Sequence, residues 1–226
     1  HVRSRRQRQM CIRDSNNTVG IILTCAILYD FLFRSSISYN MLFLEEIWSR
    51  NLINLFVSPL KISEIIIALT CTALIRTLIG LIPAVLIAIP LFGISLMDLG
   101  LPLLLLLFSL YLFGITLGLL VTAGLVRFGP SFENIAWASL FFIAPLGCIY
   151  YPVEILPNWL QVVALALPLA HIFEETRSIL ITNTVDYVNI YNALALNLVY
   201  LSIALLTFYR SFKTAKIKGS LINVGE

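Results

Sequence analysis

The chain has 226 residues, of which 59% are hydrophobic and only 12% are charged, and its mean hydropathy is +0.94. Soluble domains carry about a quarter of their residues as charged side chains, so this composition excludes a water-soluble globular fold and indicates an integral membrane protein. The formal charge of +3 comes from five arginines in the first 13 residues; without residues 1–15, ten basic residues face eleven acidic ones, which excludes the basic surface of a nucleic-acid-binding protein.

Residues 1–15 differ in composition from everything that follows. They lack the apolar run and the small-residue cleavage site of a signal peptide. A polybasic segment on the membrane surface is one interpretation, and foreign sequence in place of a natural N-terminus is the other. We favour the second, so we expect residues 1–15 to be a foreign or disordered extension and leave them out of the fold prediction.

Five apolar segments are candidates to cross a hydrocarbon core about 30 Å thick, since each helical residue advances about 1.5 Å. They are residues 18–33, 62–92, 99–126, 134–153 and 187–209. The sequence therefore predicts an all-α membrane protein, a polytopic bundle of transmembrane helices over residues 16–212, with a tail over residues 213–226. Because the first of the five would start on the outside, we expect six spans in the whole protein.

A polar segment, residues 43–61, interrupts the apolar pattern after the first span. Residues 43–58 fit an amphipathic helix, and Ser58-Pro59 ends it because proline disfavours helix in the residue before it. The polar side chains that a partner could bind are Glu45, Glu46, Arg50 and Asn51. We favour docking on a cytoplasmic protein over an interfacial helix on lipid, because adjacent carboxylates are repelled by anionic headgroups.

Residues 155–182 are a different kind of apolar segment, interrupted by Pro157 and Pro168. A full span here would place the C-terminus on the side opposite to the polar segment. We therefore expect a re-entrant element that enters and leaves the membrane on one side, which is tolerated where protein buries it. The candidate residues of this element and its approach are Tyr151, Pro152, Trp159, Glu174 and Arg177.

Lys and Arg are distributed unequally between the two sides of this topology. One side has only Arg177, and the other has Arg34, Arg50, Lys61, Arg127, Arg210, Lys213, Lys216 and Lys218. Positive residues mark the cytoplasmic side. The polar segment and the C-terminus are therefore predicted to be cytoplasmic, and residues 155–182 external.

Arg76 lies inside the second span, where an arginine at the bilayer centre costs about 2.5–3.5 kcal/mol. A buried ion pair within the membrane, with Asp30 as a candidate partner, is one interpretation. The other is a side chain that extends to the interface, which would have to cover a depth of roughly 18 Å. We favour the buried pair.

Gly114, Gly118 and Thr122 form a stripe of small residues at helical spacing in the third span. Such stripes let two helices approach closely. We expect this one to pack against another helix of the same chain in preference to a second copy.

The sequence lacks the residues of the common catalytic sites. It has no phosphate-binding Gly-x4-Gly-Lys-Ser/Thr loop, so we expect no ATP hydrolysis by this chain. Its four cysteines have no Cys-x-x-Cys spacing and it has only two histidines, which argues against a zinc site or a disulfide framework. We therefore predict no catalytic residue, no cofactor and no metal site in this chain.

Two segments resemble those of one family. Phe43-Leu-Glu-Glu-Ile-Trp-Ser-Arg-Asn-Leu52, with Val57-Ser-Pro-Leu60, is similar to the cytoplasmic coupling helix of ATP-binding-cassette type-2 (ABC-2) export permeases. Tyr150-Tyr-Pro-Val-Glu-Ile-Leu-Pro-Asn-Trp-Leu-Gln161, with Leu167-Pro-Leu-Ala-His-Ile-Phe-Glu-Glu-Thr-Arg177, resembles the external re-entrant element of that family. The likeness extends from residue 18 to about residue 210.

The resemblance implies a permease subunit of an ATP-driven exporter in the inner membrane, surrounded by lipid and without nucleic acid. Such a subunit forms a homodimer and is driven by a cytoplasmic ABC ATPase that holds ATP and Mg²⁺. Glu45, Glu46, Arg50 and Asn51 would then contact the ATPase. Two other functions stay open at this point: an intramembrane transferase that uses His171, Glu174 and Glu175, and a membrane scaffold whose polar segment recruits a partner.

Overall fold

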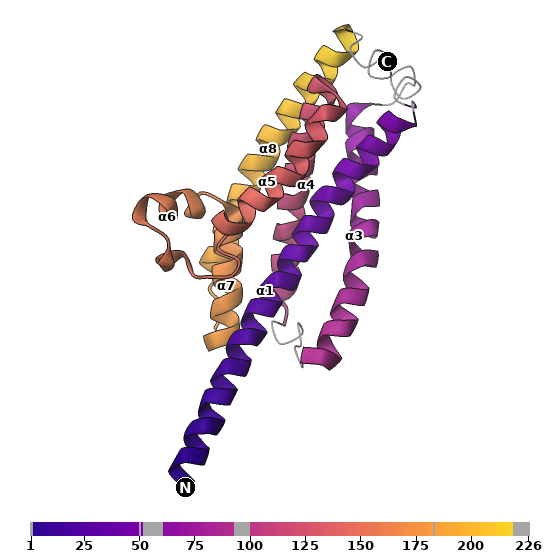
Figure 1. Cartoon of the computed structure of the whole chain (residues 1–226). Coiled ribbons are helices and arrows are strands. Elements are labelled where there is room, and N and C mark those ends of the chain that lie inside the picture. The colour runs from indigo at the N-terminus through magenta and orange to yellow at the C-terminus, as the bar shows by residue number, and fades with distance from the viewer. Residues whose placement is uncertain (1, 50, 52–60, 93–99, 183, 219–226) are drawn as a thin grey trace.

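The computed structural model describes residues 2–49, 51, 61–92, 100–182 and 184–218, and within these ranges it is a bundle of helices without strands (Figure 1). The α-helices are α1 (Val2–Trp48), α3 (Ile62–Phe92), α4 (Pro102–Phe128), α5 (Glu133–Leu146), α6 (Asn158–Leu165), α7 (Pro168–Thr182) and α8 (Tyr187–Lys218). Two 3₁₀ turns, η2 (Pro130–Phe132) and η3 (Val153–Ile155), connect them. In the described ranges α1, α3, α4 and α8 are long and apolar enough to cross a membrane, which confirms the all-helical polytopic class.

The central helix of the bundle is α4, which packs against α1 on one side and α8 on the other. In its most apolar window 61% of the residues are buried, against 17% for α3. Leu106, Leu110, Leu119 and Leu125 of α4 are fully buried. The spans α3 and α8 therefore leave most of their apolar surface for lipid or for other proteins.

The small-residue stripe of α4 forms its contact with α1, as predicted. A side chain added to Gly114 would collide with Ser35 of α1, and a Cβ added to Gly118 would lie 2.8 Å from the Cβ of Tyr39. One turn further, the Thr122 hydroxyl is 3.3 Å from the Asn40 side-chain oxygen. The stripe packs within one chain because each small residue faces a side chain of α1.

The first span is longer than the sequence suggested. α1 continues from the predicted span 18–33 through residues 34–48, and it also includes residues 2–15, for which an extension outside the fold was expected. Nothing interrupts this helix, because the sequence has neither glycine nor proline between Gly20 and Pro59. Residues 43–48 of the expected helix 43–58 are helical, but they continue α1 and do not begin a separate helix, and residues 50 and 52–58 of that helix lie outside the described residues.

The predicted fourth span, 134–153, contains one short α-helix, α5, and ends at the start of the 3₁₀ turn η3. α5 ends at Leu146 and has 14 residues, about 21 Å, too short to cross the membrane. It ends there because Pro145 removes a backbone donor and Gly147 follows as the C-cap. α5 covers the half of the bundle nearer the C-terminus, and α7 covers the other half, with α6 at the side between them (Figure 1).

Exposed aromatic side chains mark two levels along α8. Tyr191 and Tyr209 are both exposed and lie 18 positions apart, about 27 Å along a helix. No charged residue lies between them. Tyr and Trp gather at membrane interfaces, so the hydrocarbon layer fits between these two levels. Trp48 and Phe128, at the ends of α1 and α4, add exposed aromatic rings at the end where Tyr209 lies.

Candidate functional site

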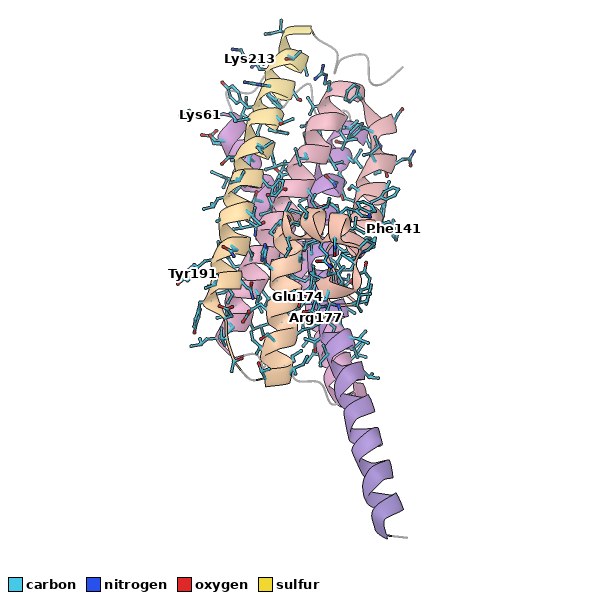
Figure 2. All side chains as sticks on the ribbon, turned by 90° about the vertical axis from the view of Figure 1, so that its left-hand side faces the viewer. Lys61, Phe141, Glu174, Arg177, Tyr191 and Lys213 are labelled. Carbon is cyan, nitrogen blue, oxygen red and sulfur yellow. The ribbon has the colours of Figure 1, made fainter. Side chains whose placement is uncertain are left out.

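Lys61, at the start of α3, and Lys213, in the C-terminal part of α8, lie toward the same end of the bundle (Figure 2). Glu174, Arg177 and Tyr191 lie toward the other end. The sequence candidates therefore fall into two groups, one at the end with the polar segment and one in the half of the bundle around α7.

Residues 45–49 and 51 of the polar segment lie at the C-terminal end of α1. The side-chain amide of Asn51 donates to the Glu46 carboxylate at 2.8 Å, and its backbone N–H donates to the Glu46 carbonyl at 3.2 Å. Ser49 donates its hydroxyl to the same carbonyl. These bonds satisfy carbonyls that a helix end leaves free. The structure thus brings three ATPase-contact candidates together, Glu45, Glu46 and Asn51, while Arg50 lies outside the described residues.

Glu45 also pairs with Arg76 of α3. The two guanidinium nitrogens Nη1 and Nη2 each donate to one carboxylate oxygen of Glu45, both at 2.9 Å. Such a two-point contact fixes direction as well as distance. The side chains are 43% and 50% exposed, so this is a surface pair. The predicted buried pair of Arg76 with Asp30 is wrong, because the long arginine side chain extends toward the end of α1 and pairs with the carboxylate of Glu45.

Asp30 pairs with Arg34 on its own helix at 2.6 Å. The four-residue spacing in the sequence was the signal for this pair. α1 continues 14 positions beyond Arg34, about 21 Å, so Arg34 lies inside the span and not on the cytoplasmic side where we had counted it. Gly80 of α3 leaves the space that the Arg34 guanidinium occupies, since a Cβ there would lie 3.0 Å from its Nη1.

The Asp30–Arg34 pair stays partly open on the surface of one chain, with side chains 37% and 43% exposed. Charged groups at such a depth face protein or water and not lipid. We therefore expect the surface of α1 around this pair to face protein or water.

In the other half of the bundle, Arg177 of α7 holds the backbone that follows α5. It donates to the carbonyls of Cys148 and Ile149 at 2.7 and 3.3 Å, and to the Glu174 carboxylate at 2.8 Å. Glu174 in turn accepts the backbone N–H of Val153 at 2.8 Å. Cys148 has φ 53°, a conformation that costs a non-glycine residue about 1–2 kcal/mol. The buried arginine thus anchors the turn between α5 and η3.

Glu175, the neighbour of Glu174, is fully buried. Its carboxylate accepts the backbone N–H of Asp186 at 2.7 Å and the side-chain amide of Asn189 at 3.2 Å. Asp186 directly precedes α8, so a negative charge sits at the N-terminus of that helix, where it is favourable. This role was missed in the sequence, since the contact spans two helices.

The remaining candidates of the re-entrant element have structural roles or stay on the surface. Tyr151 donates its hydroxyl to the carbonyl of Pro145, and Pro152 begins the 3₁₀ turn η3. Trp159 on α6 is 71% exposed. The exposed indole and the lateral position of α6 suit a helix at the membrane interface. Of the predicted set, Glu174 and Arg177 are joined directly, Tyr151 and Pro152 lie in the chain between α5 and η3, and Trp159 lies apart on α6.

A buried polar contact between α4 and α8 escaped the sequence analysis. Asn197 donates its amide to the hydroxyl and the carbonyl of Ser109, at 2.7 and 2.9 Å. Both residues are buried. An asparagine inside an uncharged run was the available signal, since hydrogen bonds between polar side chains hold membrane helices together.

Comparison with known proteins identifies the family of this chain. A sequence model of the family described as "ABC-2 type transporter" matches residues 5–181, which is more than half of the chain and includes α3, α4, α5 and α6. A search of curated proteins gave no match. The match confirms the resemblance seen in the sequence: the chain belongs to the ABC-2 type transporter family, as a membrane component of a transporter.

Proposed function

We propose that this chain is the permease subunit of an ATP-driven exporter and that residues 43–61 receive the force from a separate ATPase subunit, which binds ATP and Mg²⁺. The observation that carries the proposal is the two-point pair between Glu45 and Arg76. It ties the end of α1, which includes the first residues of the polar segment, to the interior of α3. A push on that segment would therefore act on two spanning helices at once, as rigid-body rocking requires.

The partly exposed Asp30–Arg34 pair supports a second element of the proposal, a homodimer. At membrane depth this pair needs a protein or aqueous neighbour, and a second copy of the chain would supply it. The substrate would then move outward along the seam between the two copies. Membrane lipid would cover the apolar faces of α3 and α8 that remain.

Charge at the two ends of the bundle supports an inner-membrane location with a cytoplasmic C-terminus. Lys61 and Lys213 lie toward the end of the bundle where α1 and α8 end (Figure 2), and Arg127, Arg210 and Lys216 lie in the C-terminal parts of α4 and α8. Residues 2–15, with their five arginines, continue α1 beyond the opposite end. The orientation is therefore proposed from residues 16–226, where the Lys and Arg bias remains one-sided.

The carboxylates of α7 favour the exporter over an intramembrane transferase. Glu174 and Glu175 each accept a backbone N–H, from Val153 and Asp186. His171 donates through Nε2 to the carbonyl of Leu165 at 2.9 Å. All three side chains hydrogen-bond to the backbone of this chain. An acid or base catalyst, in contrast, has to reach a substrate.

The test is a cysteine crosslink between the exit of α1 and a co-expressed ABC ATPase. Asn51→Cys would be introduced in a chain whose native cysteines are replaced, which matters most for the exposed Cys71 on α3. Because the polar segment contacts the ATPase in the proposal, we expect a crosslink whose yield changes when ATP is added.

The matched control is Thr184→Cys, an exposed position at the opposite end of the bundle. It should give no crosslink under the same conditions. Equal yields at positions 51 and 184, or an Asn51→Cys crosslink that ignores ATP with every candidate ATPase, would contradict the coupling role and leave a scaffold as the better reading.

A further inference from the structure

The last part of α8 continues beyond the hydrocarbon layer as a helix that the bundle holds in place. The helix ends at Lys218, and the exposed Tyr209 marks the level where the layer ends. After this level, Ser211, Phe212 and Ala215 are at most 9% exposed. They lie one, three and four positions apart, so they share one face of the helix. Because this face is packed, the opposite face is held in a fixed direction.

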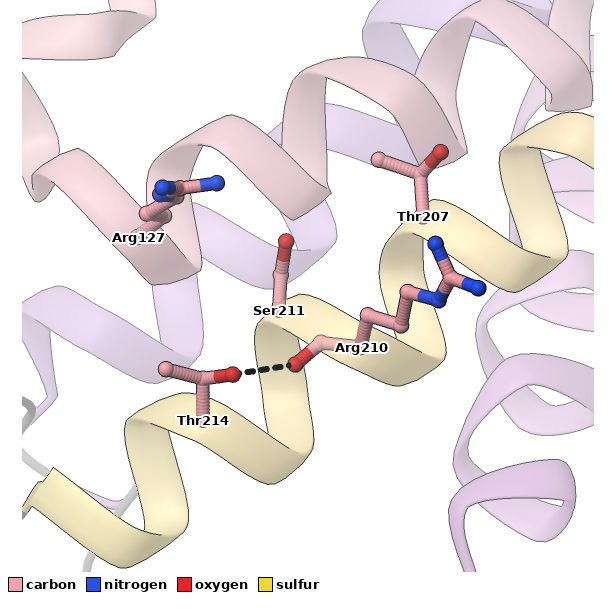
Figure 3. Close-up of a pocket in the computed structure, with 5 residues that line it drawn as sticks. All are labelled: Arg127, Thr207, Arg210, Ser211 and Thr214. Atoms are coloured by element: carbon pink, nitrogen blue, oxygen red, sulfur yellow. Dashed lines mark hydrogen bonds between the residues drawn. The ribbon is translucent and has the colours of Figure 1, made fainter.

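Figure 3 shows how this part of α8 lies beside α4. The two helices leave a cavity of about 290 Å³, and the Ser211 hydroxyl points toward α4. Thr214 donates its hydroxyl to the carbonyl of Arg210 on its own helix, at 2.8 Å. Arg127 and Arg210 are exposed, and their guanidinium groups point away from each other. The positive charge at this end of the bundle is therefore directed outward and is not gathered into one pocket.

The exposed face of this part of α8 combines positive charge with one apolar side chain. Lys213 and Lys216 are exposed, and Ile217 is 76% exposed. Among the residues that the structure describes, no carboxylate lies within salt-bridge distance of either lysine. Protein interfaces combine an apolar centre with a polar rim, and charged groups at the rim meet the opposite charge on the partner. This face has the composition of a contact for an acidic protein surface.

The distance from the membrane favours a protein over a lipid as the partner. The headgroup layer extends about 5–8 Å beyond the hydrocarbon on each side. Lys216 and Ile217 lie seven and eight positions after Tyr209, about 10 and 12 Å along the helix. Ile217 is therefore beyond the headgroups and cannot insert into the hydrocarbon. A protein outside the membrane can cover the lysines and Ile217 together.

The same end of the bundle carries the polar segment. Lys61, the last residue of that segment, and Lys213 lie toward this end (Figure 2), and α1 and α8 both end there (Figure 1). A protein that contacts the polar segment would therefore lie on the side of the membrane to which α8 extends.

Given the ATPase subunit of the proposed function, on which the inference rests, we propose that Lys213, Lys216 and Ile217 form a second docking surface for that subunit. We call these three residues the α8 surface. It binds an acidic patch of the ATPase and is separate from residues 43–61. Because α8 packs along α4, a push on the α8 surface would act on the central helix, whereas the Glu45–Arg76 pair connects α1 and α3.

The first test is a cysteine crosslink at the α8 surface. Ile217→Cys would be introduced in the full chain without native cysteines and tested with the same co-expressed ABC ATPases as Asn51→Cys. We expect both positions to give a crosslink. A crosslink at position 51 alone would overturn the α8 surface and leave the proposed function intact. A crosslink at position 217 alone would keep the α8 surface and contradict coupling through residues 43–61. No crosslink at either position with any candidate ATPase would overturn both.

The second test measures the affinity of the crosslinked ATPase for the purified full chain in phosphatidylcholine nanodiscs. Lys213→Glu with Lys216→Glu should weaken association by at least about tenfold, because like charges that face each other across an interface oppose binding. Lys213→Arg with Lys216→Arg keeps the charge and should stay within about twofold of the wild type. The melting temperature would confirm that both variants are folded.

The apolar part of the α8 surface has its own matched control. Ile217→Ala should weaken association severalfold, because the partner loses apolar contact area. Ile203→Ala changes an exposed isoleucine of the same helix inside the hydrocarbon stretch and should leave association unchanged.

Two results of the affinity measurement would overturn the proposal. Equal affinities of the glutamate and arginine pairs would show that the lysines do not contact the ATPase. A loss in the glutamate pair that occurs only in nanodiscs with phosphatidylglycerol would show that the lysines bind anionic lipid instead.

Discussion

The side chain of Arg76 is long enough for its charged group to reach Glu45 near the end of α1, although its Cα lies inside a spanning helix. Helical side chains lean toward the N-terminus of their own helix, and α1 and α3 run in opposite directions (Figure 1). Glu45 therefore leans back along α1, while Arg76 leans toward the start of α3. The two groups meet between these levels, which places the guanidinium nearer the membrane surface than its own Cα.

Reversing charges within this pair tests its role in coupling. Arg76→Glu would place two carboxylates side by side, so we expect a severalfold loss of the ATP-dependent change in crosslinking at position 51. The double variant Glu45→Arg with Arg76→Glu restores opposite charges and should recover at least about half of that change. Because exposed ion pairs contribute only about 0–1 kcal/mol to stability, the melting temperature should shift by no more than a few degrees.

Failure of the double variant to exceed Arg76→Glu would mean that the pair itself is not the link. An unchanged response in Arg76→Glu would have the same meaning. A large fall in melting temperature would instead point to a structural role, which the exposure of both side chains argues against.

At the scale of the element, the contact between α1 and α4 depends on two residues without side chains. We expect Gly118→Ala to destabilise the protein, because its methyl group would have to displace Tyr39, whose Cβ would lie 2.8 Å away. Overpacking of this kind costs about 1–3 kcal/mol. The measurement is the melting temperature of the purified protein in detergent, which should fall by several degrees.

Gly20→Ala is the matched control on α1. A Cβ at Gly20 meets nothing within 4 Å, and alanine is favoured over glycine inside a helix by about 0.5–1 kcal/mol. This variant should be as stable as the wild type or more so. Equal melting temperatures for the two variants would rule out close packing at Gly118 as a determinant of stability.

The helix boundaries show which parts of the fold a sequence can specify. The prediction for residues 62–92 agrees with α3, and the start of α8 at residue 187 was also correct, because Lys61 and Gly93 bound the first apolar run and Asp186 precedes the second. The end of α5 at Leu146 was not predicted, because the uncharged run continues to Val153. Pro145 and Gly147 were the signals in the sequence that indicated this helix end. The length of α1 was missed because hydropathy falls at Asp30 and Arg34, while the helix continues through both.

The candidate site was less predictable than the fold for a physical reason. Pairs within one helix, such as Glu174 with Arg177, follow from spacing alone. The Glu45–Arg76 pair depends on the relative heights of two helices, and the hold of Arg177 on the turn at Cys148 depends on how α7 meets the end of α5. Neither contact between helices can be predicted from local residue spacing. The sequence therefore identified Arg76 as unusual but predicted the wrong partner for it.

At the scale of the whole molecule, one end of the bundle carries the C-terminal ends of α1 and α8, and the other carries the end of α7 and the start of α8 (Figure 1). In the proposed function this asymmetry sets the direction of transport, because an ATPase can act only from the cytoplasm. The residues that report it are exposed at both ends of one helix: Thr184 precedes α8, and Lys213 lies near its C-terminus.

Cysteine labelling in intact cells measures this orientation directly. We expect Thr184→Cys to react with a membrane-impermeant maleimide in intact cells, and Lys213→Cys to react only after permeabilisation, because the Lys and Arg of residues 16–226 gather at the end of Lys213. Both variants need the background without native cysteines, since Cys71 is exposed. The reverse pattern would place residues 43–61 outside the cell, where no ATPase could reach them, and the coupling role would have to be abandoned even though the chain kept its family fold.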